Sequence, residues 1–159
     1  KKKTDVMKER ILEINKDAEV IIIDEKINND NIDIIFNYKI DYLIDACDTV
    51  SVKKELIKQC LKRNIKFISS MGTGNKLDPS KLQICDIRKT NYDPLAKIIR
   101  KFVKDEKINN QVMVVSSNEC PKKIKGNISS ISYVPAVAGI LCASYVINNI
   151  IEMVSDKND

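Results

Sequence analysis

The chain has 159 residues and a formal net charge of +5 at pH 7, and 43% of its residues are hydrophobic and 31% charged. These values are typical of a soluble globular protein that is long enough to bury a core, and we treat residues 1–159 as a single domain. The sequence contains no histidine, which excludes imidazole general bases, Ser-His-Asp triads and most zinc sites.

Up to Ser70, the predicted elements alternate between helices and strands. Apolar residues three and four positions apart predict helices, and short β-branched or continuous apolar runs predict strands. In chain order we expect helix Asp5–Asn15 with Thr4 as its cap, strand Glu19–Ile23, helix Asn28–Asn37, strand Tyr42–Ala46, helix Thr49–Arg63 with Lys53 facing outward, and strand Lys66–Ser70. This alternation predicts an α/β fold with a Rossmann-like, mostly parallel sheet flanked by helices.

The rest of the chain predicts additional carboxyl-terminal strands and a long apolar final helix. The elements are strand Leu82–Cys85, helix Pro94–Asp105, strands Val112–Ser116 and Ile128–Tyr133, and helix Pro135–Val154. The last apolar run approaches the length of a membrane span. Two adjacent amides near its end, Asn148 and Asn149, favour a buried or interface helix.

The five cysteines and the basic charge bear on compartment and partners. The cysteines are odd in number and too widely spaced for the Cys-x-x-Cys pattern of zinc sites, so we expect a protein of the reducing cytoplasm. The basic excess suits a polyanionic partner such as tRNA. Biased base composition in a chain rich in lysine, asparagine and isoleucine accounts for it equally well.

Two carboxylates end the apolar strand that begins at Tyr42. Because open α/β folds bind ligands at the carboxyl ends of their strands, we expect Asp48 at the rim of a site. An aspartate here is also typical of a cap for a helix that starts at Thr49, and both roles are compatible. For Asp45 we favour a buried carboxylate that accepts hydrogen bonds from backbone amides of the following turn.

Two further groups of residues are candidates for ligand contacts. Gly72 and Gly74 follow a strand, where glycine lets backbone N–H groups approach a ligand, although an ordinary turn explains them as well. A basic cluster provides candidate contacts to tRNA phosphates, although a solvated helix face gives the same pattern. Its members are Arg88, Lys89, Arg100 and Lys101.

Together these motifs resemble the ThiF/MoeB/HesA superfamily of ATP-dependent adenylating enzymes, which are related to ubiquitin-activating enzymes, and within it the tRNA threonylcarbamoyladenosine dehydratases. The matching elements are the Asp-Ala-x-Asp strand end at 45–48, the Gly-x-Gly and Asp-Pro loop at 72–79, the Asp-Ile-x-Lys-Thr segment at 86–90 and the Asp-Pro-Leu-Ala segment at 93–96. Superfamily members begin with a strand and a Gly-x-Gly-x-x-Gly phosphate loop that this sequence lacks. We therefore interpret the chain as the carboxyl-terminal portion of an adenylating domain, truncated at its amino terminus.

The resemblance implies ATP and Mg²⁺ as cofactors. Asp48 would be the catalytic residue that binds Mg²⁺ through ATP, Lys3 would contact the nucleotide phosphates, and Gly72, Gly74 and Asp78 would line the substrate side of the pocket. Cys120 occupies a variable position in a family-like segment, so we expect no obligatory catalytic cysteine.

The activity that the resemblance implies is ATP-dependent dehydration, by cyclisation, of threonylcarbamoyladenosine in tRNA, through activation of its carboxylate. It also implies a homodimer and association with the missing amino-terminal half, without which the isolated chain would be inactive. Two alternatives remain: adenylation of a ubiquitin-like sulfur-carrier protein, whose enzymes commonly carry paired zinc cysteines, and a non-catalytic RNA-binding fragment.

Overall fold

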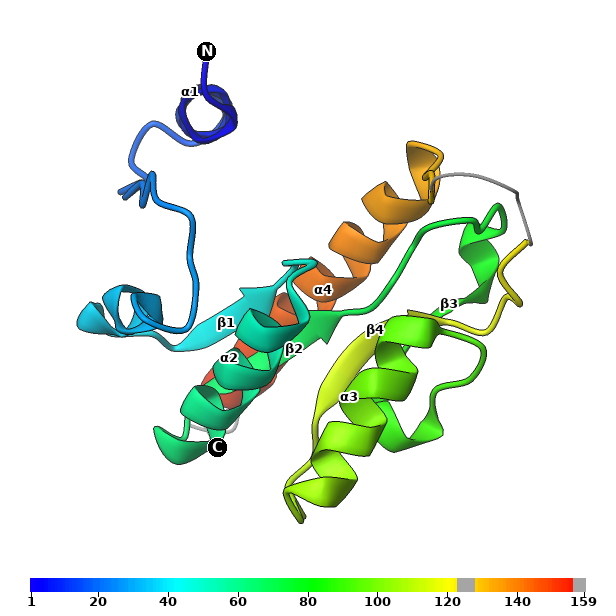
Figure 1. The fold of residues 1–159 in the computed structure, drawn as a ribbon. Helices are drawn as coiled ribbons and strands as arrows, with labels where there is room; N and C mark the ends of the chain where they lie inside the picture. Colours follow the sequence, from blue (N-terminus) through cyan, green and yellow to red (C-terminus); the bar gives the residue numbers. More distant parts are fainter. Residues whose placement is uncertain (123–127, 156–159) are drawn as a thin grey trace.

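The computed structural model describes residues 1–122 and 128–155, and within them a mixed sheet lies between two layers of helices (Figure 1). The helices are α1 (Lys3–Ile14), α2 (Val50–Lys62), α3 (Pro94–Asp105) and α4 (Tyr133–Ser155), with short 3-10 helices η1 (Ile32–Asn37), η2 (Pro79–Lys81) and η3 (Ile87–Lys89). The strands are β1 (Tyr42–Asp45), β2 (Lys66–Ser70), β3 (Leu82–Asp86) and β4 (Met113–Ser117).

The sheet has the strand order β1-β2-β4-β3. β1, β2 and β4 run parallel, and β3 is antiparallel to β4. Asp45 is paired with Ser69, and Ser69 with Val114. The carboxyl ends of β1 and β2 therefore reach the same edge of the sheet, where open α/β folds place their ligands.

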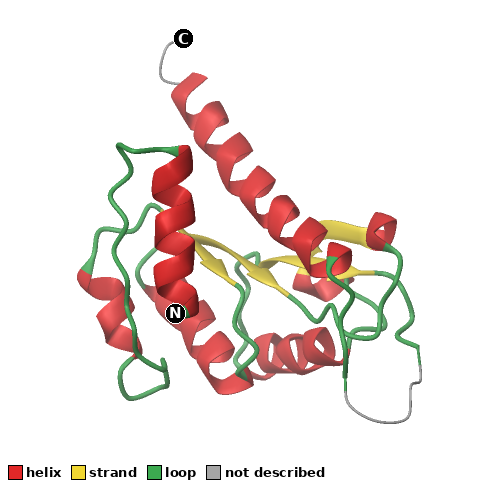
Figure 2. Cartoon of the chain, turned by 90° about the horizontal axis from the view of Figure 1, so that it is seen from above, coloured by secondary structure: helices red, strands yellow, loops and turns green. Residues whose placement is uncertain are grey.

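Each face of the sheet carries its own apolar core. α2 and α3 cover one face, where Ile57 and Ile99 pack with Phe67 and Val114. α4 covers the opposite face, where Ala138 and Cys142 pack with Ile68 and Val115. Successive side chains of a strand point to opposite faces, which explains why adjacent residues belong to different cores. Figure 2 shows the sheet between these two layers.

The final helix is long, apolar and only partly covered. α4 has 23 residues and meets the length and composition criteria for a membrane span, with 17% of its most apolar window buried. Those criteria alone are weak evidence, because core helices of soluble proteins also meet them. The exposed fractions of Ile140 and Ile147 are 65% and 55%, so one face of α4 is available for another surface.

The predicted α/β fold, with its mostly parallel sheet and apolar final helix, is confirmed, but two predicted strands are wrong. Glu19–Ile23 is irregular and has no strand beside it within the described chain. A strand needs a neighbour to pair its N–H and C=O groups, so β-branched composition alone does not form one. Ile128–Tyr133 leads directly into α4, which starts at Tyr133. The predicted helix Asn28–Asn37 is restricted to η1.

The first helix differs from its prediction in its cap and in its packing. α1 begins at Lys3, with Lys2 at the N-cap position and no side-chain cap, so Thr4 lies inside the helix. α1 buries none of its residues, and Figure 1 shows it standing apart from the sheet. Helical spacing of apolar residues thus identified the element correctly, although its apolar face has no core to pack on in the described chain.

Candidate functional site

A cavity of about 350 Å³ lies where the carboxyl ends of β1 and β2 meet the amino-terminal turns of α4. Its walls include Ala46 and Asp48 from the segment after β1, Ser70 and Thr73 from the end of β2 and the loop that follows, and Ala138 from α4. Asp48 is the one carboxylate among the described lining residues. The predicted position of this aspartate, at an open site on the carboxyl edge of the sheet, is therefore where the structure has it.

Asp48 is exposed, and within the described residues it forms no hydrogen bond or ion pair. The N-cap of α2 is Thr49, and no side chain caps this helix. The alternative interpretation of Asp48 as a helix cap is therefore wrong. Its carboxylate is left facing the cavity without a cationic partner, which suits a group that accepts a metal ion or a ligand donor.

Asp45 lies three positions before Asp48 but has the opposite environment. The side chain of Asp45 is buried, and its Oδ2 atom lies 2.7 Å from Nζ of Lys53. The same Oδ2 accepts a hydrogen bond from Oγ of Ser69 at 2.6 Å, and Oδ1 accepts one from the backbone N–H of Cys47 at 3.1 Å. The predicted bond from the following turn is thus present, but the main partner is a lysine.

Lys53 is the clearest error of the sequence prediction, because it is buried and does not face outward. Its exposed fraction is 0%, and Nζ also donates to Oγ of Ser69 and the backbone carbonyl of Ser70, each at 3.0 Å. Lys53 precedes Ile57 by four positions and Cys60 by seven, both of which are buried in α2. Residues so spaced share a helix face, and this signal was available in the sequence.

The loop after β2 is held in place by two buried charged side chains. Nζ of Lys76 donates to the carbonyl of Gly72 at 2.6 Å and to Oδ2 of Asp93 at 2.8 Å. The carboxylate of Glu119 accepts from the backbone N–H groups of Leu77 and Asp78. Lys76, Asp93 and Glu119 were missed as site-forming residues, since their partners lie far away in the sequence.

The two loop glycines lie close to other side chains. A Cβ atom at Gly72 would lie 3.2 Å from Oδ2 of Asp93, and one at Gly74 would lie 2.3 Å from a methyl carbon of Ile128. Both glycines line a separate small cavity of about 160 Å³, and Thr73 between them lines the Asp48 cavity.

The remaining predicted nucleotide residues are not brought to Asp48. Asp78 accepts from the backbone N–H of Ser80 at 3.0 Å and so caps η2. Lys3 is exposed on α1 and is not among the residues that line the Asp48 cavity. Contact of Lys3 with nucleotide phosphates therefore stays a prediction.

The thiols near the cavity are poor nucleophiles. Burial, a hydrogen bond with Asp45 and the charge of that carboxylate raise the pKa of Cys47 to about 12. Burial also raises the pKa of Cys142, which lines the cavity. The thiolate is the reactive form of cysteine, so these raised pKa values disfavour the two thiols as nucleophiles at neutral pH. The absence of an obligatory catalytic cysteine stays a prediction.

The predicted basic cluster divides between two places. Arg88, Arg100 and Lys101 line one cleft along α3, whereas Lys89 is exposed and lies outside the described lining of that cleft. α3 packs on the sheet face opposite to α4. The basic residues thus form a surface separate from the Asp48 cavity.

The donor set of the Asp48 cavity fits a metal ion that is held mainly by a ligand. No group of three or more histidine, cysteine, aspartate or glutamate residues able to hold a metal occurs in the described part of the chain. Mg²⁺ is commonly bound by one or two carboxylates together with substrate phosphates and water. One free carboxylate with the nearby hydroxyls of Ser70 and Thr73 is therefore suited to Mg²⁺ that arrives with a polyphosphate.

Comparison with known proteins identifies the family. The model of the ThiF family matches residues 1–158. A Bacillus subtilis protein, tRNA threonylcarbamoyladenosine dehydratase, is 38% identical over 173 aligned positions that cover 98% of this chain and 68% of that protein. The Escherichia coli protein of the same name is 36% identical over 104 positions, which cover 65% of this chain and 39% of that protein.

Solved structures agree with this relationship. The E. coli dehydratase in complex with AMP superimposes with a TM-score of 0.87 at 28% identity, over 97% of this chain and 66% of that one. Its complex with ATP gives a TM-score of 0.86 at 28% identity, over 96% of this chain and 65% of that one. The chain thus spans about two thirds of the length of these relatives.

Proposed function

The chain belongs to the ThiF family, and on that premise we propose that the protein is an ATP-dependent tRNA threonylcarbamoyladenosine dehydratase, with residues 1–159 as a single domain that forms the carboxyl-terminal part of its adenylating unit. The observation that carries the proposal is the free carboxylate of Asp48 in an open cavity at the carboxyl edge of a sheet. The dehydratase from B. subtilis, 38% identical over nearly the whole chain, supplies the substrate class.

The chemistry requires activation of a carboxylate. ATP, when bound, would supply an electrophilic phosphorus: a carboxylate oxygen of the threonylcarbamoyl group would attack it and displace the remaining phosphates. Ring closure onto the activated carbonyl would then expel the phosphate-containing group in place of hydroxide. Asp48 would hold Mg²⁺ against the polyphosphate, and Lys3 would contact its phosphates. Thr73 is held between two glycines of a loop that Lys76 fixes in place, so this loop can exclude water from the activated carbonyl.

Replacing Asp48 by asparagine tests this assignment. We expect Asp48→Asn in the complete protein to reduce ATP-dependent dehydration of modified tRNA by about 100-fold or more, a loss typical of removing one electrostatic contact to the transition state. The product nucleoside is lighter by one water and is measured by mass spectrometry of digested tRNA. Asp41→Asn, at an exposed position before β1, is the matched control with the same change of charge.

The outcomes separate the competing functions. Wild-type turnover by the Asp48→Asn variant, at an unchanged melting temperature, would remove Asp48 from the mechanism. Binding of tRNA without any ATP turnover would support the RNA-binding alternative. ATP consumption that depends on a sulfur-carrier protein and not on tRNA would support the other alternative, which the lack of a metal-holding cysteine cluster in the described residues disfavours.

A second copy of the chain is the proposed partner of α4. Exposed apolar residues recur along α4 with alternating spacings of four and three, which is the seam pattern of paired helices. The seam comprises Ala136, Ile140, Ala143, Ile147 and Ile150. We expect Ile147→Asp to shift a homodimer to monomer in light scattering, whereas Asn148→Asp, next to the seam, leaves the dimer intact. A monomeric wild-type protein would contradict this proposal.

Two further proposals concern assembly and compartment. β1 forms one edge of the sheet within the described chain, and a strand contributed by the amino-terminal half of such a domain would pair with its free N–H and C=O groups. All five cysteines are free thiols, which supports a cytoplasmic location.

A further inference from the structure

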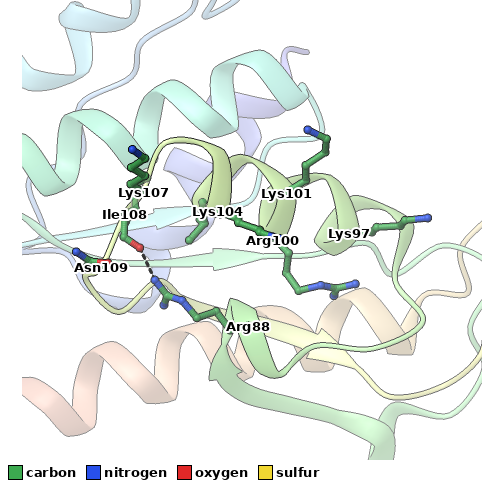
Figure 3. Close-up of a pocket in the computed structure, with 9 residues that line it drawn as sticks. Arg88, Lys97, Arg100, Lys101, Lys104, Lys107, Ile108 and Asn109 are labelled. Atoms are coloured by element: carbon green, nitrogen blue, oxygen red, sulfur yellow. Dashed lines mark hydrogen bonds between the residues drawn. The ribbon is translucent and has the colours of Figure 1, made fainter.

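A larger cavity of about 780 Å³ runs along α3, and six of its nine lining residues are cationic (Figure 3). The basic residues of this cleft are Arg88, Lys97, Arg100, Lys101, Lys104 and Lys107, and its described lining contains no aspartate or glutamate. It lies on the face of the sheet that carries α2 and α3, whereas the Asp48 cavity lies at the start of α4. The cleft is therefore a separate site.

Most of the positive charge of this cleft is not neutralised by neighbouring carboxylates. Arg88 pairs with Asp86 at 3.0 Å, and Lys101 pairs with Asp105 at 2.5 Å. Within the described residues, Arg100 donates to the backbone carbonyl and the hydroxyl of Thr90, at 2.8 and 2.5 Å, and has no carboxylate partner.

The other three lysines, Lys97, Lys104 and Lys107, form no ion pair within residues 1–122 and 128–155. With Arg100, four of the six cations of the cleft remain available to an anion.

Two cations are held in place by the backbone. Arg88 donates to the carbonyl of Ile108 at 2.5 Å, a bond drawn in Figure 3, which holds its guanidinium beside the segment that follows α3. Lys107 has a φ of 52°, a left-handed conformation that ends helices and that normally selects glycine or asparagine. A lysine here meets the negative end of the helix dipole favourably, and it also extends the row of cations beyond α3.

The cations lie at intervals that match a linear polyanion. From Lys97 to Lys107 the chain advances ten positions, or about 15 Å at the helical rise of 1.5 Å per residue. Such a length exceeds a single phosphate and matches about four nucleotides at 3.4 Å per step of one strand. The apolar lining is limited to Val103 and Ile108, without an aromatic side chain for base stacking.

We propose that this cleft binds the phosphate backbone of the tRNA substrate and anchors it away from the reacting nucleoside; this inference rests on the proposed function. Because the contacts are to phosphates and not to base edges, binding through the cleft is independent of sequence and depends strongly on salt. Lys97, Lys104 and Lys107 join Arg88, Arg100 and Lys101 in this role, and Lys89 does not.

The test removes two unpaired cations of the row, one at its start and one near its end. The double variant Lys97→Gln/Lys104→Gln keeps helix propensity, because lysine and glutamine have similar values. The control Lys16→Gln/Lys39→Gln removes the same charge from exposed positions outside the cleft. Affinity of the complete protein for a tRNA transcript is measured by filter binding at several salt concentrations.

The expected loss follows from counterion release. Each lost phosphate contact lowers the slope of log K against log salt by about 0.7 to 0.9, so the double variant should lose about 1.4 to 1.8 in slope. At 0.15 M salt this corresponds to a loss of about 20-fold in affinity. The control should keep both the slope and the affinity of the wild type.

Equal behaviour of the two double variants would overturn the proposal, as would a loss of affinity without a change of slope. The proposal would also be overturned if the Lys97→Gln/Lys104→Gln variant lost binding to poly-glutamate but kept the tRNA affinity of the wild type. The cleft would then bind an acidic protein and not tRNA. Dehydration of modified tRNA by the wild-type protein is followed separately by mass spectrometry, which keeps the binding test distinct from the proposed function. The enzyme can be a dehydratase even if the cleft does not anchor the tRNA.

Discussion

Removing the cation of the buried Asp45–Lys53 pair should destabilise the protein strongly. The two side chains have exposed fractions of 1% and 0% and an Nζ–Oδ2 distance of 2.7 Å. In Lys53→Met the methionine fills a similar volume, but the carboxylate of Asp45 stays buried without its cation; its remaining partners in the described structure are the hydroxyl of Ser69 and the backbone N–H and thiol of Cys47. An uncompensated charge in this environment is costly because the interior screens it poorly.

The magnitude follows from the burial of both partners. Truncating one partner of a buried ion pair costs about 3–5 kcal/mol. For a domain of this size, about 1 kcal/mol corresponds to a shift of roughly 2–4 °C in melting temperature, so Lys53→Met should melt about 6–20 °C below the wild type. Asp45→Asn leaves the ammonium of Lys53 buried without its counter-charge, and we expect a loss of similar size.

Urea unfolding of the wild type, the two single variants and the double variant Asp45→Asn/Lys53→Met measures the coupling. Because the double variant buries no charge, its loss should be smaller than the sum of the single losses by about 1–3 kcal/mol, in the range found for contacting residues. Lys62→Met, exposed in the last turn of the same helix, is the control. Additive losses, or a Lys53→Met variant as stable as this control, would refute the reasoning.

Two further predictions concern acid stability and thiol reactivity. Burial alone would raise the pKa of Asp86, but the backbone N–H groups of Arg88 and Val112 and the Arg88 guanidinium hold it below its ordinary value. The stabilisation that the Asp86 carboxylate gives the fold is complete above about pH 3.9 and is lost as the pH falls through the lower pKa of the folded state. Asp86→Asn should therefore flatten the dependence of urea stability on pH in this acid range, whereas Asp17→Asn, at an exposed position, should not. Iodoacetamide at pH 8 should modify exposed Cys120 well before Cys47, because burial and Asp45 raise the pKa of Cys47 to about 12. Peptide mapping measures the labelling of each cysteine, and equal labelling of the two would contradict this prediction.

The sequence predicted the elements whose apolar residues form a continuous buried face. α3 begins and ends as predicted because Pro94 suits the first turn and the apolar spacing persists to its end. β2 has its predicted bounds, and the predicted ends of β1 and β4 differ from the observed ends by no more than one residue. For β1 and β4 the signal was an apolar run, which indicates burial on both faces. Glu19–Ile23 failed because a strand depends on a neighbour, which local composition cannot specify.

The site was predicted where it depends on chain order and missed where it depends on distant partners. The position of Asp48 at the carboxyl edge follows from the strand before it. The role of Lys76 depends on Asp93, seventeen positions away, and that of Glu119 on the backbone of Leu77, forty-two positions away. A lysine in a loop reads as solvated unless the tertiary fold is known, since charged residues are almost never buried without a partner.

The contrast between Asp45 and Asp48 shows how the fold separates a structural carboxylate from one that is free for a ligand. Asp45 is the last residue of β1 and Asp48 follows it, and either carboxylate would attract a cation. Lys53 and Ser69 neutralise and bond the first, which ties the ends of β1 and β2 to α2 and fixes the direction in which the chain leaves the sheet. Asp48 has no cationic partner in the described structure, so its negative charge remains available at the cavity. Because the Asp45–Lys53 pair holds the end of β1 just before Asp48, Lys53 would affect ligand binding through the position of Asp48, without touching the ligand itself.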